Sequence, residues 1–183
     1  MGQPKPWLPF GSERMLQRVV RLLGEAVGPV LVAAARGQDL PGLPSEVEIV
    51  VDRQPARGPL EGIAVGLAAI GGRAEAAFVT GCDVPLLRPD WVRRIVELSA
   101  GYDAAVPHAG GRDQPLSAVY HTRVLAQAEA LLAAGHSRPA LLLDLVRTRR
   151  IAAEELADVD PDLESLLNVN SPEDYAAALA RAR

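Results

Sequence analysis

Asp83 is well placed for chemistry because it ends an apolar run. Residues 76–83, AAFVTGCD, have the composition of a buried strand, and Pro85 prevents that strand from continuing. Ligands of open α/β sheets bind outside the carboxyl ends of the strands, so the Asp83 carboxylate is expected in that crevice. Carboxylates suit Mg²⁺, which keeps several waters and takes one or two protein oxygens beside substrate phosphates. Alternatively, Asp83 only forms a turn at the end of the strand, and this residue alone does not distinguish a metal ligand from a turn residue.

A second candidate site lies in residues 50–62, VVDRQPARGPLEG. Asp52 ends another apolar run, and Gly58 and Gly62 bracket the start of a helix. Glycines leave the backbone uncovered, and a helix N-terminus offers free amides to an anion or to the edge of a base. Glycines before a helix more often make a turn, so these residues indicate either a nucleotide-binding loop or a simple turn.

Other reactive side chains carry weaker signals. Cys82 has no histidine near it in sequence, which favours a small buried residue over a nucleophile. His108, His121 and His136 are scattered without the spacing of metal ligands and are interpreted as surface or loop residues.

Helical and extended segments alternate along the chain and predict the scaffold that positions these residues. Apolar spacing predicts helices at 12–28, 59–70, 89–101, 122–135, 139–146 and after Ser171, and strands at 29–35, 47–52, 76–83, 103–107 and 116–121. In the last helix, Ser171 is the cap, Pro172 takes the first position and Asp174 completes a capping box. The alternation predicts a three-layer, Rossmann-like α/β sandwich with a mostly parallel sheet, whose apolar strands are buried on both faces.

Length and composition limit the functional classes. The 183 residues predict a single domain over 1–183, and glycines and prolines interrupt every apolar run well short of a membrane span. A net charge of −4 gives no general attraction to nucleic acid, so a phosphate ligand needs locally placed Lys or Arg. The single cysteine excludes an internal disulfide framework and is typical of a cytoplasmic protein.

Five motifs occur in a characteristic order. They are MGxxK at 1–5, Asp52 followed by GPLEG at 58–62, CDVPLL at 82–87, RDQPLSAVY at 112–120 and NVNSPEDY at 168–175. Together they closely resemble the molybdenum cofactor guanylyltransferases, the MobA family of nucleotidyltransferases. The resemblance covers essentially the whole chain, and the order of the motifs carries it. It implies transfer of a guanylyl group from GTP to molybdopterin, with release of pyrophosphate.

The resemblance also implies roles for individual residues. Lys5 and Asp83 would be catalytic: Lys5 contacts the nucleotide phosphates, and Asp83 binds Mg²⁺ and the nucleotide. Asp52, Gly58 and Gly62 complete the implied nucleotide-binding residues.

The second substrate is assigned to other residues. The resemblance places Asn168 and Asn170 on the pterin side. Arg112 and Asp113 lie on an expected loop before a strand, where they either face the second substrate or form a surface ion pair. The implied partners are GTP and molybdopterin, with molybdoenzymes or their chaperones as recipients, and the protein is expected to be a monomer.

The base preference has alternatives. Many relatives carry an asparagine where this chain has Ala33. A molybdopterin cytidylyltransferase or a sugar-phosphate nucleotidyltransferase therefore stays open, as does a noncatalytic nucleotide-binding protein. The CD and NVN motifs favour guanylyl transfer.

The opening residues give one further expectation. Family members begin with a strand and a glycine-rich loop that ends in Met-Gly, and this chain starts at a matching Met-Gly. The resemblance therefore implies that the first strand and most of the phosphate loop are missing, that Met1 corresponds to an internal methionine, and that the chain as given is poorly soluble or inactive.

Overall fold

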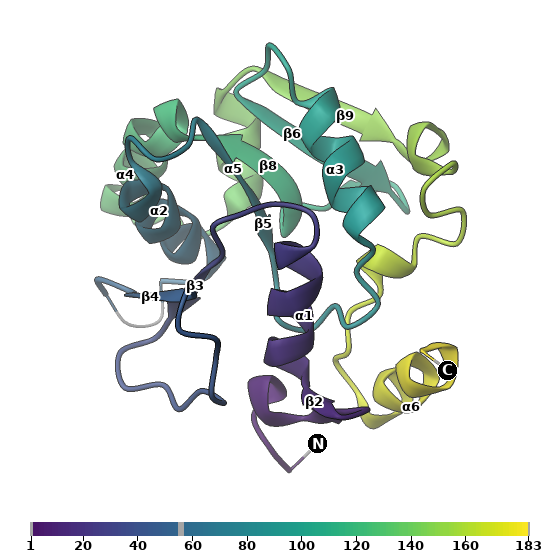
Figure 1. The fold of residues 1–183 in the computed structure, drawn as a ribbon. Coiled ribbons are helices and arrows are strands. Elements are labelled where there is room, and N and C mark those ends of the chain that lie inside the picture. Colours follow the sequence, from purple (N-terminus) through teal and green to yellow (C-terminus); the bar gives the residue numbers. More distant parts are fainter. Residues whose placement is uncertain (1, 55–56, 183) are drawn as a thin grey trace.

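The computed structural model describes residues 2–54 and 57–182, and Figure 1 shows their arrangement. In chain order the elements are η1 (Lys5–Trp7), β1 (Pro9–Phe10), β2 (Glu13–Arg14), α1 (Met15–Gly24), β3 (Leu31–Ala34), β4 (Glu48–Val51), α2 (Pro59–Ile70), β5 (Ala76–Thr80), α3 (Pro89–Leu98), β6 (Ala104–Ala109), β7 (Arg112–Asp113), β8 (Ser117–His121), η2 (Thr122–Val124), α4 (Leu125–Ala133), α5 (Pro139–Leu145), β9 (Thr148–Ala152), η3 (Ala153–Leu156), η4 (Glu164–Leu166) and α6 (Pro172–Arg181). None of the helices in this described part is long and apolar enough to cross a bilayer.

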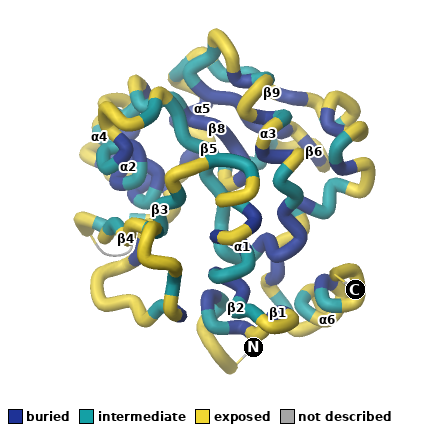
Figure 2. Tube along the Cα trace, viewed as in Figure 1, coloured by how far each residue is buried: buried dark blue, intermediate teal, exposed yellow. Residues whose placement is uncertain are grey.

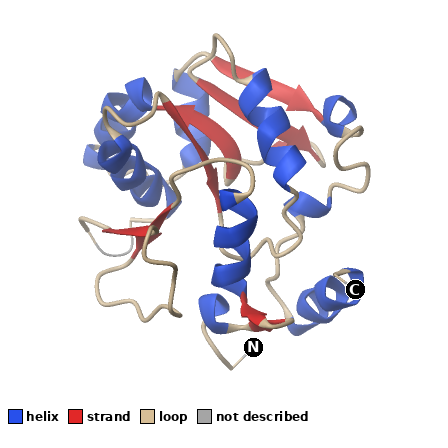
Figure 3. Cartoon of the chain, in the orientation of Figure 1, coloured by secondary structure: helices blue, strands red, loops and turns tan. Residues whose placement is uncertain are grey.

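The main sheet lies between two layers of helices, which confirms a layered α/β fold (Figure 3). Its strand order is β5-β8-β6-β7, with β9 also paired to β6. Side chains alternate between the two faces of each strand. Val106 and Tyr120 therefore pack with α2, α4 and α5, whereas Ala105 and Val119 pack with α1 and α3.

The prediction of a mostly parallel sheet is wrong. Strand β8 pairs antiparallel with both β5 and β6, and β7 pairs antiparallel with β6. Among the described residues, the parallel pairs are β3–β4 and β6–β9. The cause is the connection between β6 and β8, which turns through Gly110 and Gly111 at φ 61° and 73° and contains no helix. A link of this length makes a hairpin, because a parallel crossover needs a dozen residues or more.

Strands β3 and β4 form a separate parallel pair and are more exposed than the sequence predicts. Ile49 and Val51 are 50% and 46% exposed, although an apolar run of this kind indicated burial on both faces. Figure 2 shows this region as mostly exposed or intermediate, in contrast to the buried β6 and β8.

The N-terminal stretch and the C-terminal helix meet in a small core of their own. Leu8, Phe10, Met15 and Val169 are buried there against α6. The short β1–β2 hairpin that shapes this end was not predicted.

The predicted cap of α6 is confirmed. The Asp174 amide donates to Ser171 Oγ at 3.1 Å, and the Ser171 amide donates to the Asp174 carboxylate at 2.8 Å. The start of α6 is therefore fixed immediately after the NVN motif.

Candidate active site

A three-residue cluster joins distant parts of the sequence at one end of the molecule. The Lys5 ammonium donates to Asp83 Oδ2 at 2.8 Å and to Asn170 Oδ1 at 2.6 Å. Three residues that the sequence singled out from different motifs are thus in direct contact. Lys5 is also the only lysine in a chain with 18 arginines. A compact ammonium, rather than a planar guanidinium, therefore occupies the centre of this cluster.

Lys5 is positioned by the small N-terminal core. It begins η1, and Leu8, directly after that turn, is 5% exposed. Arg14 Nη1 donates to the Trp7 carbonyl at 3.3 Å, and the Arg14 guanidinium lies 5.9 Å from the centre of the Trp7 ring. The proline-rich opening is therefore an anchored turn that presents Lys5.

Asp83 is held close to the backbone that precedes it. It follows β5 by three residues, and its Oδ1 lies where a side chain on Gly81 would stand: an added Cβ would be 2.5 Å from that oxygen. The sequence analysis did not single out Gly81. The available signal is a glycine two positions before a strand-ending aspartate, where the carboxylate folds back over the chain.

Asn170 is fixed by its neighbours on both sides. The Val169 amide donates to the Asp83 carbonyl at 2.8 Å, and Val169 is 1% exposed. The Asn170 amide donates to the Asp174 carboxylate at 3.0 Å. Amide donation by Asn170 and by Ser171 lowers the pKa of Asp174 below its usual value of 3.8. Asn168 is exposed beside this segment.

The donor set around Asp83 fits a hard divalent cation that also binds phosphate oxygens. The Lys5 ammonium donates to Asp83 Oδ2, and Asp83 Oδ1 accepts no hydrogen bond from any described residue. Across residues 2–54 and 57–182, no group of three or more His, Cys, Asp or Glu side chains could hold a metal ion. An ion here would therefore depend on Asp83, water and substrate phosphates, which is the usual pattern for Mg²⁺.

Asp52, Gly58 and Gly62 form a second group on β4 and α2. The Asp52 amide donates to the Ala34 carbonyl at 2.9 Å, and burial, followed by the charge of Glu61, raises the pKa of Asp52. No hydrogen bond or ion pair within the described part of the chain joins these residues to Lys5, Asp83 or Asn170.

Gly58 and Gly62 differ in whether their positions require glycine. Gly58 has φ 69°, and a Cβ there would lie 3.1 Å from the Ser137 Cβ, so the backbone and its close neighbour both favour glycine. A Cβ on Gly62 would only make an ordinary 3.6 Å contact with Ala33.

Glu61 was not predicted as a site residue, yet it is a buried acidic residue, 4% exposed. Its Oε1 accepts the Arg53 amide at 2.9 Å. Glu61 thereby ties the first turn of α2 to the residue that follows Asp52.

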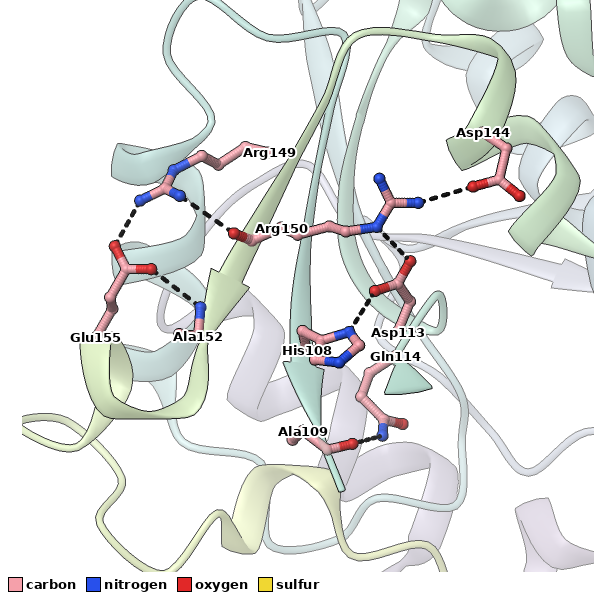
Figure 4. A network of polar contacts seen from close by, with 9 residues as sticks. All are labelled: His108, Ala109, Asp113, Gln114, Asp144, Arg149, Arg150, Ala152 and Glu155. Atoms are coloured by element: carbon pink, nitrogen blue, oxygen red, sulfur yellow. Dashed lines mark hydrogen bonds and ion pairs between the residues drawn. The ribbon is translucent and has the colours of Figure 1, made fainter. Parts of the chain in front are cut away.

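Arg112 is exposed on β7, and its neighbour Asp113 lies in a different polar network, shown in Figure 4. Asp113 accepts from His108 Nδ1 at 2.8 Å and from Arg150 Nε at 2.9 Å. Arg150 also donates to Asp144 at 2.7 Å. Asp113 thus forms surface ion pairs with partners other than Arg112, and no hydrogen bond or ion pair among the described residues joins this network to Lys5.

Cys82 is partly buried beside Asp83. Burial, with a smaller contribution from the Asp83 charge, raises the pKa of the thiol. A thiol that stays protonated is a poor nucleophile, which agrees with the interpretation from the sequence.

Solved structures share this fold. The chain aligns with a molybdopterin-guanine dinucleotide biosynthesis protein A from Archaeoglobus fulgidus at a TM-score of 0.81 and 19% identity, covering 99% of this chain and 91% of that one. A 2-C-methyl-D-erythritol 4-phosphate cytidylyltransferase from Thermus thermophilus aligns at 0.73 and 19%, over 98% and 94%. A Mycobacterium tuberculosis protein in complex with manganese aligns at 0.66 and 18%, over 98% and 93%.

Relatives found by sequence identify the family more specifically than the shared fold does. A probable molybdenum cofactor guanylyltransferase of Pelotomaculum thermopropionicum is 34% identical over 182 residues, covering 100% of this chain and 87% of the relative. One of Mycobacterium ulcerans is 35% identical over 181 residues, covering 97% and 86%. Residues 1–151 match the model of the MobA-like NTP transferase domain. The chain therefore belongs to the MobA-like NTP transferase family, a family of nucleotidyltransferases.

Proposed function

We propose that this protein transfers GMP from GTP to molybdopterin, forming the guanine dinucleotide cofactor and releasing pyrophosphate. The relatives named probable molybdenum cofactor guanylyltransferase, aligned over 87% and 86% of their lengths, support this activity. The structural observation that carries the proposal is the contact of one ammonium, Lys5, with both Asp83 and Asn170. It brings the proposed nucleotide side and the proposed pterin side of the site together.

The reaction needs no covalent enzyme intermediate. The terminal phosphate of molybdopterin attacks the α-phosphorus of GTP, a new phosphorus–oxygen bond forms, and the bond to pyrophosphate breaks. That phosphate is ionised near neutral pH, so the reaction requires no strong general base. Catalysis then rests on positioning and on charge stabilisation.

Lys5 neutralises phosphate charge in this scheme. The Lys5 and Asp83 side chains are 33% and 22% exposed, so their ion pair is partly solvated and opens at little cost when a phosphate competes for the ammonium. Asn170 holds the ammonium from the other side.

Asp83 would hold a Mg²⁺ ion, which would neutralise charge on the transferring group when bound. The manganese complex of a structural neighbour is in keeping with a divalent ion in this fold. The choice of Mg²⁺ rests on the oxygen donor of Asp83 and on the phosphate substrate.

The remaining site assignments belong to the same proposal. Asp52, Gly58 and Gly62 bind the nucleotide, while Asn168 and Asn170, with Arg112, face the pterin.

We also propose that residues 1–183 form one nucleotidyltransferase domain and that the protein acts as a cytoplasmic monomer. Its product would pass to molybdoenzymes or their chaperones.

The test is product formation by the parent and by two aspartate variants. With GTP, Mg²⁺ and molybdopterin, the proposal predicts that the parent forms the guanine dinucleotide, in contrast to the inactivity that the family resemblance implies for the chain as given, and that Asp83→Asn loses most of that turnover. Asp90→Asn, at a side chain that is 72% exposed on α3, is the matched control and should retain it. Absence of dinucleotide from the folded parent would refute the proposed function.

A further inference from the structure

Asp160 is a buried carboxylate that the proposed reaction does not use. It is 0% exposed, and a buried charge is costly unless it is paired and hydrogen-bonded. Its Oδ1 accepts the Glu164 amide at 3.1 Å, and its Oδ2 accepts the Ser165 amide at 2.8 Å. Arg88 Nε lies 3.4 Å from Asp160 Oδ1 and supplies the opposite charge. Two amides and one guanidinium therefore hold this carboxylate in place.

Arg88 connects Asp160 to the loop that carries Asp83. It follows Asp83 by five positions and directly precedes α3. The Arg88 amide donates to Ser165 Oγ at 3.0 Å, and Arg88 Nη2 donates to Glu164 Oε2 at 2.8 Å. We define the Arg88 clamp as the contacts among Arg88, Asp160, Glu164 and Ser165.

The loop that carries Asp83 and the segment that leads into α6 are joined at two places. The Arg88 clamp is one of them. At the other, the Val169 amide donates to the Asp83 carbonyl at 2.8 Å. Between the two places the loop forms a turn, because the Leu87 amide donates to the Val84 carbonyl at 3.1 Å, and both of these side chains are 2% exposed. The loop is therefore a compact support along which the segment is fixed at both ends.

The segment itself contains a strained residue at the Arg88 clamp. Leu163 has φ 52°, and among residues 2–54 and 57–182 it is the one non-glycine residue in the left-handed region. Such a backbone conformation persists where its surroundings hold it. The Leu163 amide donates to the Asp160 carbonyl at 3.1 Å, and the Asp160 carboxylate accepts the amides of the next two residues. The chain is thus bent at a fixed point five positions before Asn168.

We propose that Arg88 and Asp160 are positioning residues for guanylyl transfer. The Arg88 clamp fixes the place of the segment with Asn168 and Asn170. It thereby keeps Asn170 Oδ1 within hydrogen-bond distance of the Lys5 ammonium, at 2.6 Å. This role deepens the proposed function and rests on it, because that function places the two asparagines at the pterin. Arg88 and Asp160 touch no substrate themselves and act through the segment.

Arg94 provides a matched comparison for Arg88. The Arg88 side chain is 41% exposed, so its ion pairs add little to global stability. The Arg94 side chain is 34% exposed, and its Nη2 donates to Asp158 at 2.6 Å. Arg94 therefore ties α3 to the chain two positions before Asp160, but it does so from within the helix and away from the loop of Asp83.

The first experiment measures amide hydrogen exchange in the parent, Arg88→Ala and Arg94→Ala. Arg88→Ala should speed exchange at Ser165 and Val169 on the order of tenfold and leave Tyr120 in β8 within about twofold of the parent. Arg94→Ala should leave exchange at all three amides nearly unchanged. Because exchange needs no substrate, this result does not depend on the proposed function.

Asp160→Asn tests the carboxylate itself, since it keeps the size of the side chain and removes the charge. It should speed exchange at Ser165 and Val169 as Arg88→Ala does, and Arg88→Ala alone decides where Asp160→Asn does not fold. Unchanged exchange at Val169 in Arg88→Ala would overturn the proposal. Equal acceleration at Val169 and Tyr120 would overturn it too, because the Arg88 clamp would then only stabilise the whole fold.

The second experiment measures ligand affinity by calorimetry. Arg88→Ala should weaken molybdopterin binding about fivefold to tenfold and leave GTP binding within about twofold of the parent, because the segment that it loosens faces the pterin. Arg94→Ala should change neither affinity. Faster exchange at Val169 without weaker molybdopterin binding would overturn the positioning role. Absence of molybdopterin binding by the parent would instead refute the proposed function, and the exchange rates would still decide whether the Arg88 clamp holds the segment.

Discussion

The Lys5 end of the molecule and the cavity between β3 and β5 differ in how completely their polar groups are paired. At the Lys5 end, contacts from the N-terminus, β5 and the segment before α6 converge, and Val169 and Lys5 both bond to Asp83. The cavity between β3 and β5, about 470 Å³ in volume, is lined mostly by apolar side chains, and Thr80 Oγ1 is buried there without a hydrogen-bond partner among the described residues.

The two regions thus differ in whether contacts within the protein already hold their polar groups in place. The side chains proposed to meet phosphate and metal are held by contacts that the described residues already make. Strands β3 and β4 form a sheet separate from the main sheet, and Asp52 directly follows β4. Helix α2 connects this side to the main sheet, because Leu60 and Ile63 pack with Tyr120. The residues that we propose to be catalytic and those that we propose to bind the nucleotide therefore lie on differently connected parts of the fold.

The largest expected effect compares the two strand-ending aspartates. Asp83→Ala should lower kcat by about a hundredfold or more with the fold intact, because it removes a preorganised electrostatic group. Asp52→Ala should mainly weaken GTP binding. Steady-state kinetics with both variants check this, and a kcat of Asp83→Ala within a few-fold of the parent would remove Asp83 from the mechanism.

The packing of Gly81 against Asp83 gives the next prediction. Gly81→Ala places a Cβ 2.5 Å from Asp83 Oδ1, so the carboxylate must move and kcat should fall about tenfold. Gly24→Ala is the matched control, because its Cβ meets nothing within 4 Å. Similar turnover in the two variants would show that the position of Asp83 is not critical.

Lys5 allows a direct test of the phosphate contact. Lys5→Ala should weaken GTP binding several-fold to tenfold and leave the melting temperature nearly unchanged, since a partly exposed lysine contributes little to folding. Calorimetry and thermal melts measure both quantities. Because Lys5 is the only lysine, an amine-reactive reagent also reports on it, and GTP should slow its labelling at this side chain. Unchanged GTP affinity with a large fall in melting temperature would make Lys5 structural.

The smallest effect concerns Asp174, whose lowered pKa reflects the amides of Asn170 and Ser171. A lowered folded-state pKa adds stability that is present above the unfolded value and is lost as pH falls through the folded value. Asp174→Ala should therefore be slightly less stable than the parent at neutral pH, and the difference should shrink well below pH 3.8. Urea unfolding at both pH values measures it, and a difference independent of pH would contradict this cause.

Local signals predicted much of the fold and part of the site. Apolar runs located β3, β4, β5 and β8, and the Ser171 cap located α6, because these features depend on neighbours in sequence. The contact between Lys5 and Asn170 spans 165 positions, so only the family resemblance brought these residues into one site.

The failures have physical causes as well. Strand β9, TRRIA, was missed because Arg149 and Arg150 interrupt its apolar pattern. The antiparallel direction of β8 follows from a turn at Gly110 and Gly111 that the sequence analysis did not interpret as a hairpin.

The central claim, guanylyl transfer to molybdopterin, is tested most directly by competition between nucleotides. The protein is incubated with molybdopterin, Mg²⁺ and equal concentrations of GTP and CTP, and the dinucleotide products are identified by mass spectrometry. We predict that the guanine dinucleotide predominates, with pyrophosphate released in equal amount. A predominant cytosine dinucleotide, or no dinucleotide from the folded protein, would contradict it.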